Sequence, residues 1–392
     1  MNNGLIAIIG GGVIGCAVAR ELSNRYDDIF LFEKNVGITQ GENQSSRNSG
    51  VIHSGIYYDR KTRYQKASLC VEGNRLLYDF CMRHRVQALK TGKLMVAQSA
   101  EEDRVLDQYL DRAMENGVVG VEKISGQMVN KLEPTVRAKS ALMIPSAGIV
   151  EPISLVYRLH TLAQKAGVEF MVGTKVTDIY GLGDFMGLTF QYPDGAMDKI
   201  RVKAVINAAG VDADLIARML NRDSSYELDP VLGESFKFYS HKRKELRLAG
   251  KNIYPTPESV ITPHGHHFTV GIHLTPTFED LSHPPSLGST ITVGPRLVPV
   301  ENRDSRPCAA SSPLIFKEKV KPFFSGLREE DLIWHQAALQ ARLKGHPDFI
   351  IRSDPQYPRF INLLGIDSPG LTASLAIARK VSNMVDGLGI ST

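Results

Sequence analysis

Cysteine and tryptophan are scarce in this sequence, which has four cysteines and one tryptophan among its 392 residues. The cysteines show neither CxxC nor CxxH spacing; they are Cys16, Cys70, Cys81 and Cys308. This pattern argues against a disulfide framework and favours reduced, mostly buried thiols. The TPHGHHF segment, with His264, His266 and His267, is a candidate metal site, but it lacks nearby cysteines and HExxH spacing. We therefore expect no bound metal.

Long apolar runs and blocks of one charge sign are also missing. No window supplies the roughly 18 consecutive apolar residues of a membrane span, and the run GLIAIIGGGVIGCAVA lacks the basic start of a secretion signal. The formal charge of +4 is spread along the chain, which suits anionic ligands or an anionic membrane surface but not nucleic acid. We expect a cytoplasmic protein with no nucleic-acid partner; peripheral contact with the inner membrane stays open.

The composition is that of an ordinary globular protein, with 43% hydrophobic and 22% charged residues. A chain of 392 residues is too long for one simple core and predicts two lobes. We find no internal repeat and no low-complexity tract.

The N-terminus reads as a β-α-β unit with strands Leu5–Ile9 and Ile29–Glu33 around a helix from Val13 to about Arg25. Between the first strand and the helix, GGGVIG satisfies the G-x-G-x-x-G pattern of dinucleotide sites. Gly10 permits a tight turn, Gly12 lets the backbone approach a pyrophosphate, and Gly15 lets helix and strand pack closely. The first-turn N–H groups, at Val13 and Ile14, then face the pyrophosphate.

Glu33 ends the second strand, where a carboxylate can hold both ribose hydroxyls. The same charge would repel a 2′-phosphate, so NADP is disfavoured, while NAD and FAD both remain. Two distant segments, AVINAAG (204–210) and GIDSPGLT (365–372), end a strand and open a helix with small residues. A cofactor domain built from the start, middle and end of the chain suits a long, permanently bound cofactor.

Further elements follow from periodicity and turn signals. We expect helices at about 63–84, 101–116, 152–167 and 372–385, strands at 169–172, 176–180, 203–207 and 360–364, antiparallel strands within 226–331, and an irregular connection over 282–313.

Several segments together resemble the D-amino-acid-oxidase-like superfamily of FAD-dependent oxidoreductases, nearest the L-2-hydroxyglutarate dehydrogenase/oxidase family. They are GGGVIGCAVARELS, Glu33, NSGVIHSGIYY, VINAAG and INLLGIDSPGLTASLAIA. The resemblance implies an α/β fold with a Rossmann-like, glutathione-reductase-type FAD-binding domain and a second, antiparallel-sheet substrate domain. The expected FAD domain comprises residues 1–85, 140–215 and 340–392, and the substrate or cap domain 86–139 and 216–339.

The resemblance also implies FAD as cofactor and a set of residues that hold it. The ADP half would contact Gly10, Gly12, Val13, Ile14, Gly15, Glu33, Lys34, Val176, Ala209 and Gly210. The span from pyrophosphate to flavin would contact Ser46, Arg47, Asn48 and Ser49, with His53 near the flavin ring. Gly365, Ser368, Gly370, Leu371 and Thr372 would approach the flavin from the C-terminal helix.

A flavin that oxidises a 2-hydroxy acid takes a hydride at N5, while a base accepts the hydroxyl proton and cations hold the carboxylates. The candidate bases are His53 and His273, although either could instead only hydrogen-bond the flavin or a backbone carbonyl. Arg342 is the candidate cation for catalysis and carboxylate binding. The candidate substrate-binding residues are Tyr254, Lys344 and Arg296, the last in a segment, 276–313, that departs from the family pattern.

The predicted function is oxidation of a small anionic 2-hydroxy acid, with L-2-hydroxyglutarate to 2-oxoglutarate favoured. Alternatives are a glycerol-3-phosphate dehydrogenase-like activity, an amine or amino-acid oxidase of the same superfamily, and a non-catalytic flavin-binding protein. The electron acceptor stays open between oxygen, a quinone and an electron-transfer protein.

Overall fold

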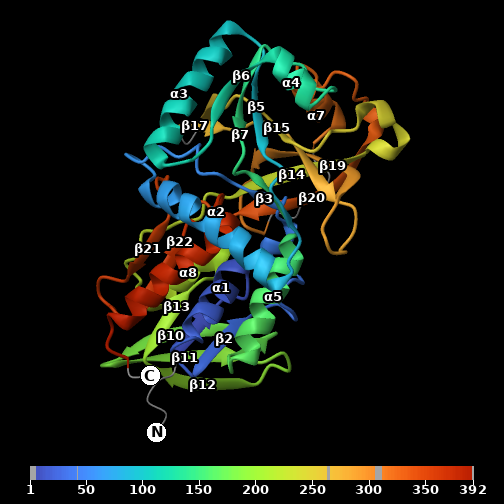
Figure 1. The fold of residues 1–392 in the computed structure, drawn as a ribbon. Coiled ribbons are helices and arrows are strands. Elements are labelled where there is room, and N and C mark those ends of the chain that lie inside the picture. The colour runs from blue at the N-terminus through green and yellow to red at the C-terminus, as the bar shows by residue number, and fades with distance from the viewer. Residues whose placement is uncertain (1–5, 42, 263–264, 305–310, 391–392) are drawn as a thin grey trace. The chain divides into compact units, whose positions relative to one another are not determined.

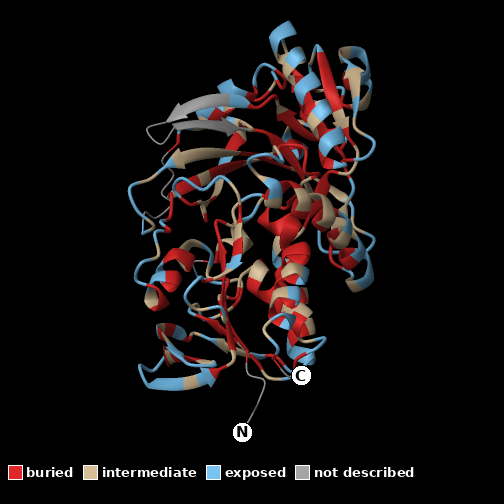
Figure 2. Cartoon of the chain, turned by 90° about the vertical axis from the view of Figure 1, so that its left-hand side faces the viewer, coloured by how far each residue is buried: buried red, intermediate tan, exposed pale blue. Residues whose placement is uncertain are grey.

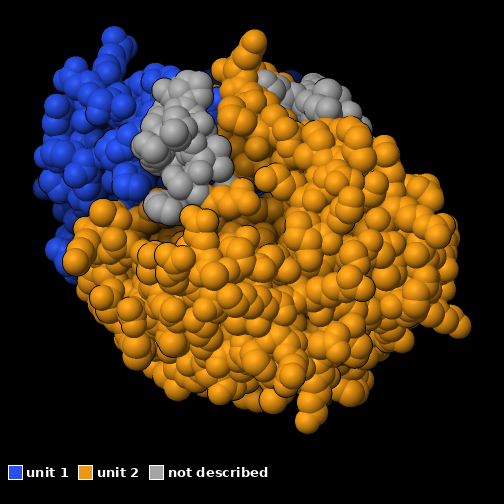
Figure 3. Space-filling model, turned by 90° about the horizontal axis from the view of Figure 1, so that it is seen from above, with its two compact units in different colours: residues 1–47, 152–230, 340–392 blue, residues 48–151, 231–339 orange. Residues whose placement is uncertain are grey.

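The computed structural model describes residues 6–41, 43–262, 265–304 and 311–390, without the side chains of 259–269. Two compact units divide the chain: unit 1 comprises 1–47, 152–230 and 340–392, and unit 2 comprises 48–151 and 231–339 (Figure 3). These boundaries differ from the expected ones, because 48–85 and 140–151 belong to unit 2 and 216–230 to unit 1. The strand Val51–Ile52 pairs with Gly148–Val150, which ties the first two stretches together. His264, Cys308 and the side chains of His266 and His267 lie outside the described residues.

Unit 1 is built on a six-stranded sheet of order β21-β22-β13-β1-β2-β9 (Figure 1). Its strands are β1 (Ile6–Ile9), β2 (Ile29–Glu33), β9 (Glu169–Val172), β13 (Ala204–Asn207), β21 (Ile350–Ser353) and β22 (Phe360–Leu364). All the pairings are parallel except the edge pair of β21 and β22. The apolar runs of β1, β13 and β22 are buried throughout (Figure 2), as a parallel sheet covered on both faces requires.

Helices and a small sheet cover this sheet. Helix α1 (Val13–Leu22) contacts both α5 (Pro152–Lys165) and α8 (Gly370–Asp386). An antiparallel sheet of β10 (Lys175–Leu182), β11 (Phe185–Gln191) and β12 (Met197–Val202) shares an apolar core with Ala7, Ile9 and Phe32. The remaining elements of unit 1 are η1 (Ser45–Arg47), η2 (Gly210–Asp212) and α6 (Ala213–Leu220). The predicted Rossmann-like unit is confirmed.

Unit 2 is built on an eight-stranded sheet of order β20-β14-β19-β18-β15-β5-β7-β6. Its strands are β5 (Lys93–Ala97), β6 (Glu122–Ser125), β7 (Ser140–Ile144), β14 (Val231–Tyr239), β15 (Asn252–Pro255), β18 (Leu274–Phe278), β19 (Leu287–Pro299) and β20 (Leu332–Gln340). The predicted sheet of a second domain is present, and its pairings with a described register are antiparallel apart from the parallel pair β5 and β15.

The irregular connection expected over 282–313 is wrong for its middle part, because β19 is a 13-residue strand within it. Its β-branched run Thr290–Val293 pairs with β14 on one side and β18 on the other. β-branched residues favour strands, and here that preference prevails over the prolines of the segment.

The other elements of unit 2 are shorter sheets and helices. They are β3 (Val51–Ile52), β4 (Ala88–Leu89), β8 (Gly148–Val150), β16 (Glu258–Thr262), β17 (Gly265–Thr269), α2 (Tyr64–His84), α3 (Ala100–Asn116), α4 (Gly126–Leu132), α7 (Pro313–Val320), η3 (Ser240–Lys242), η4 (Lys244–Leu246) and η5 (Glu329–Asp331). In the described part of the chain, none of the helices has the length and apolarity needed to cross a bilayer.

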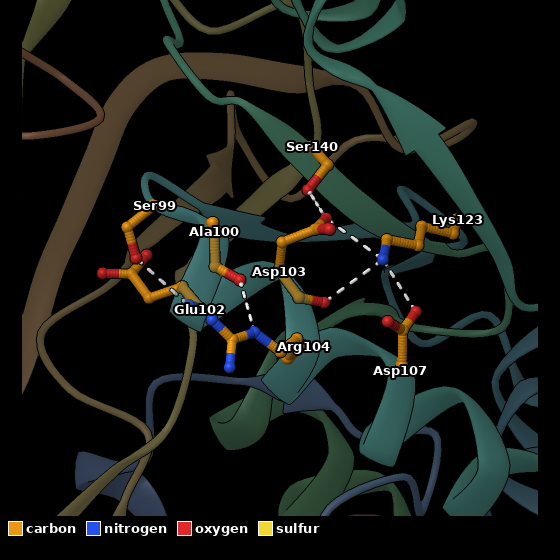
Figure 4. Close-up of polar contacts among 8 residues, drawn as sticks. All are labelled: Ser99, Ala100, Glu102, Asp103, Arg104, Asp107, Lys123 and Ser140. Atoms are coloured by element: carbon orange, nitrogen blue, oxygen red, sulfur yellow. Dashed lines mark hydrogen bonds and ion pairs between the residues drawn. The ribbon is translucent and has the colours of Figure 1, made fainter.

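Polar contacts hold the first turns of α3 against the eight-stranded sheet of unit 2 (Figure 4). The Ser99 hydroxyl accepts a hydrogen bond from the Glu102 backbone N–H and caps the helix. Lys123 of β6 donates to Asp107, with 2.7 Å between Nζ and Oδ1, and forms an ion pair with Asp103. The Ser140 hydroxyl and the Lys123 ammonium lower the pKa of Asp103.

Candidate active site

The glycine turn of unit 1 joins β1 to α1. Gly10 has a φ of +106°, and a Cβ on Gly15 would lie 1.8 Å from the Gly10 carbonyl oxygen. Only glycine therefore permits this approach of helix to strand. At the first turn of α1, the Val13 N–H donates to the Ser45 hydroxyl, with 3.0 Å between N and Oγ. Ser45 was not among the predicted residues, and no spacing rule connects it to a turn 32 positions earlier.

Glu33 is buried at the end of β2, beside the glycine turn. Its Oε2 accepts from the Gly11 N–H at 2.7 Å, and its Oε1 accepts from the backbone and side-chain amides of Asn35 at 2.8 and 2.7 Å. The carboxylate is thus held in place by three donors, at the position where a dinucleotide presents its ribose.

The end of β13 lies at the same edge of the sheet. Lys34 pairs with Asp212, with 2.8 Å between Nζ and Oδ2, and so connects the residue after Glu33 to the turn that follows Ala209. Gly210 in this turn has a φ of +59°. Val176 was also predicted to contact the ADP half of FAD. Its side chain is 4% exposed and packs in the apolar core of unit 1.

The predicted flavin-side residues of unit 1 lie in two segments. Ser46 donates from its hydroxyl to the Asn43 carbonyl at 2.9 Å, and Arg47 donates to the Gly41 carbonyl at 3.0 Å. Gly365 (φ +68°) follows β22, and Ser368 precedes the start of α8. Gly370, Leu371 and Thr372 form the buried first turn of α8, so a second helix N-terminus exists in the unit that holds the glycine turn.

Asn48 and Ser49 lie in unit 2. The Asn48 side chain accepts from the Gly50 N–H, with 2.9 Å between Oδ1 and N, and shapes the entry to β3. The structure thus brings most of the predicted cofactor residues together in unit 1. A glycine turn without room for a Cβ, a helix N-terminus and a fixed carboxylate fit a dinucleotide cofactor such as FAD.

His273 and Tyr254, two of the predicted residues, stack on each other in unit 2. Their ring centroids are 3.7 Å apart, with 17° between the ring planes. Nδ1 of His273 lies 3.0 Å from the Gly271 carbonyl oxygen and therefore donates to it, which leaves Nε2 as the acceptor of the neutral ring. Burial, aided by the charge of Lys93, lowers the pKa of His273 to about 3.

His53 belongs to the same group of side chains. Its ring faces the ring of Tyr57 edge-on at 6.5 Å, and its backbone carbonyl accepts from the Asn74 amide at 2.8 Å. Burial lowers the pKa of His53 well below its usual value, and the charges of Lys93 and His273 lower it further. Both candidate bases are therefore neutral at physiological pH.

Lys93 was missed by the sequence reasoning. It is fully buried, and its Nζ lies 3.7 Å from the ring centroid of Tyr254 and 5.0 Å from that of Tyr57. Burial lowers the pKa of Lys93 to about 7. A signal was present: Lys93, Met95 and Ala97 share one face of a strand, and the last two are apolar.

The other predicted cations each have an acidic or hydroxyl partner within their own unit. Arg342 and Lys344, in unit 1, form ion pairs with Asp229 at 3.4 Å and Glu227 at 2.5 Å. Arg296, on β19 of unit 2, donates to the Ser311 hydroxyl, which in turn donates to buried Glu234. The proposed roles of these three cations in carboxylate binding stay predictions. Among the described residues, no group of three or more His, Cys, Asp or Glu side chains is placed to hold a metal ion.

Comparison with known proteins gives consistent matches. The model of a family described as FAD dependent oxidoreductase matches residues 6–384. L-2-hydroxyglutarate dehydrogenase, mitochondrial, of Caenorhabditis elegans is 30% identical over 93% of this chain and 82% of its own, and the Arabidopsis thaliana protein of that name is 29% identical over 96% and 82%. Dithionite-reduced L-alpha-glycerophosphate oxidase from Mycoplasma pneumoniae, with FAD bound, superposes with a TM-score of 0.83 at 26% identity, covering 98% of this chain and 95% of its own.

Proposed function

Because the chain belongs to the FAD-dependent oxidoreductase family, we propose that it oxidises the CH–OH group of a small anionic 2-hydroxy acid. L-2-hydroxyglutarate is the favoured substrate, with 2-oxoglutarate as product, since relatives that match most of the chain carry the name of that dehydrogenase. FAD, when bound, supplies the hydride acceptor at its N5.

The observation that carries the proposal is the pair of neutral histidines, the half-buried His53 and the buried His273, in one group with Tyr254. A neutral imidazole can accept the hydroxyl proton of an alcohol, which the removal of a hydride requires. A carboxylate that enters beside these rings raises their pKa, because a negative charge favours the protonated form. The substrate would thereby strengthen the base that it needs.

The protein loaded with FAD should be yellow and should bleach under anaerobic titration with L-2-hydroxyglutarate. The panel includes D-2-hydroxyglutarate, glycerol 3-phosphate and amino acids, because the glycerophosphate oxidase match and the family keep these alternatives open. If glycerol 3-phosphate or an amino acid bleaches the flavin and L-2-hydroxyglutarate does not, that compound becomes the proposed substrate instead. Oxidised absorbance that persists with every compound would contradict the enzymatic proposal.

The electron acceptor follows from a second measurement on the reduced protein. Rates of flavin reoxidation by air, by a soluble quinone and by a one-electron dye distinguish an oxidase from a dehydrogenase. A cytoplasmic location, with or without peripheral membrane contact, remains a proposal that cell fractionation tests.

A further inference from the structure

Lys93 carries its ammonium into an apolar core. It begins β5, where it shares a strand face with Met95 and Ala97, and the core cluster around it includes both of these residues, Cys70 and Tyr254. Lys93 is 0% exposed. A buried cation costs several kcal/mol of folding free energy unless a partner compensates for it.

No acidic partner compensates for Lys93 among the described residues. Its Nζ has no hydrogen-bond partner there, and neither does the hydroxyl of Tyr57, whose ring centroid lies 5.0 Å from Nζ. The rings of Tyr57 and Tyr254 stabilise the ammonium through their faces. They supply no formal negative charge, and the Tyr254 hydroxyl also has no hydrogen-bond partner in the described part of the chain. The Lys93 ammonium and the hydroxyls of both tyrosines therefore remain unsatisfied.

We propose that Lys93 and the Tyr57 hydroxyl form an anion-binding site in unit 2 that takes a carboxylate group. A single ammonium balances the single charge of a carboxylate, whereas a phosphate dianion would remain undercompensated. His53, which is partly exposed and lies edge-on to Tyr57, marks the side from which the carboxylate enters. That this carboxylate belongs to the substrate rests on the proposed function; that the site binds a carboxylate does not.

A purely structural lysine would behave differently on substitution. If the contacts with the two tyrosine rings justified the buried charge, Lys93→Met would lower the melting temperature. If the charge is kept for a ligand, Lys93→Met removes an uncompensated cation and leaves the melting temperature of the ligand-free protein unchanged or raised.

The test uses FAD-loaded protein and glutarate, a dicarboxylate without the C2 hydroxyl that is oxidised. Isothermal titration calorimetry should show that wild type binds glutarate and that Lys93→Met weakens binding about 10- to 100-fold, the range expected for losing one charge-assisted hydrogen bond. Lys90→Met is the matched control, since Lys90 is exposed although its Nζ lies 5.4 Å from the ring centroid of Tyr78. This control should bind glutarate like wild type.

Two further measurements keep the proposal testable if Lys93→Met does not fold. Tyr57→Phe removes only the hydroxyl and should weaken glutarate binding about 3- to 10-fold. Neutral glutaramide should bind wild type at least about tenfold more weakly than glutarate. Absence of glutarate binding, equal binding by Lys93→Met, or equal binding of glutaramide would each overturn the site. Bleaching by L-2-hydroxyglutarate would still support the proposed function in those cases, so the two failures are distinguishable.

Discussion

The Glu33 carboxylate accepts a hydrogen bond from the backbone N–H of Gly11, with 2.7 Å between Oε2 and N, across 22 positions of the chain. This bond ties the end of β2 to the glycine turn. A Cβ on Gly11 would lie 3.1 Å from the same carboxylate oxygen, so the turn and the acid are fitted to each other. The acid is therefore oriented before a ribose reaches it, and binding needs little reorganisation.

Glu33→Ala should weaken FAD binding about 10- to 100-fold, because it removes both the ribose acceptor and a contact that orders the turn. Titration of apoprotein with FAD, monitored by the quenching of flavin fluorescence on binding, gives the dissociation constant. Glu169→Ala is the matched control, since Glu169 is exposed at the start of the neighbouring strand β9. Unchanged FAD affinity in Glu33→Ala would contradict the assignment of Glu33 to the ribose.

Gly15→Ala should abolish FAD binding and lower the melting temperature, since its Cβ would lie 1.8 Å from the Gly10 carbonyl oxygen. The ratio of absorbance at the flavin and protein bands, with a thermal melt, reports both effects. Gly387→Ala provides the comparison, because Gly387 already has right-handed helical angles at the end of α8. A yellow Gly15→Ala protein with wild-type stability would show that the helix can move away from the turn.

His53→Asn should slow flavin reduction by about 10²- to 10⁴-fold, as loss of a general base does. His273→Asn should cost only about tenfold, since His273 is 3% exposed and its Nδ1 is held by the Gly271 carbonyl, which suits support of Tyr254. Anaerobic stopped-flow absorbance with L-2-hydroxyglutarate gives the rates. His160→Asn is the control, because burial also lowers the pKa of His160, which packs edge-to-face against Phe170 in unit 1. A larger rate loss in His273→Asn than in His53→Asn would make His273 the base.

Glutarate binding should weaken as pH rises above about 7, the pKa to which burial lowers Lys93. Below that pH the ammonium is protonated and affinity is constant; above it, affinity falls by up to tenfold per pH unit. The ionisable groups around Lys93 are Cys70, Tyr57, Tyr254, His53 and His273, and burial shifts the pKa of each away from neutrality. Affinity that stays constant between pH 6 and 9 would contradict the role of Lys93.

The same pKa fixes a stability difference between wild type and Lys93→Met. Folded Lys93 releases its proton near pH 7 and the unfolded chain near pH 10.5, so the unfolded state binds more protons in between. Stability of the wild type should therefore rise with pH through this interval relative to Lys93→Met. Thermal melts of both proteins at pH 6, 7.5 and 9 should show the largest advantage of the variant at pH 6.

Arg296→Ala should destabilise the fold by about 2–4 kcal/mol, because it leaves the buried Glu234 carboxylate without its cation. Arg296→Ala combined with Glu234→Gln should recover part of that loss. Denaturant unfolding measures both free energies. A change in substrate affinity at constant stability would instead support the predicted substrate contact of Arg296.

The cofactor unit was largely predictable because its signals are short-range. The spacing of Gly10, Gly12 and Gly15, the apolar runs on either side and the acid at Glu33 are all readable within one β-α-β unit. The bounds of β2, β9 and β22 match the predicted strands.

The substrate side was less predictable because it depends on distant pairings. The shared strand face with Met95 and Ala97 indicates that Lys93 is buried, but its aromatic partner is set only by the pairing of β5 with β15, which carries Tyr254 from far along the chain. Ser45 and Arg296 likewise owe their partners to tertiary contacts. Segment 282–313 was misjudged because its prolines outweighed the β-branched run in the sequence reasoning, whereas pairing on both sides decides the strand.

The interleaved order of unit 1 has a consequence for synthesis of the protein. Central strand β1 pairs with β13, and β13 pairs with β22, so the nascent chain must wait for about 350 more residues before this row of strands is complete. Until then the nascent chain exposes apolar strand edges that other chains can join. Slowly completed parallel sheets are prone to aggregate, so yield in a cell should depend on temperature and chaperone supply more than on the stability of the finished fold.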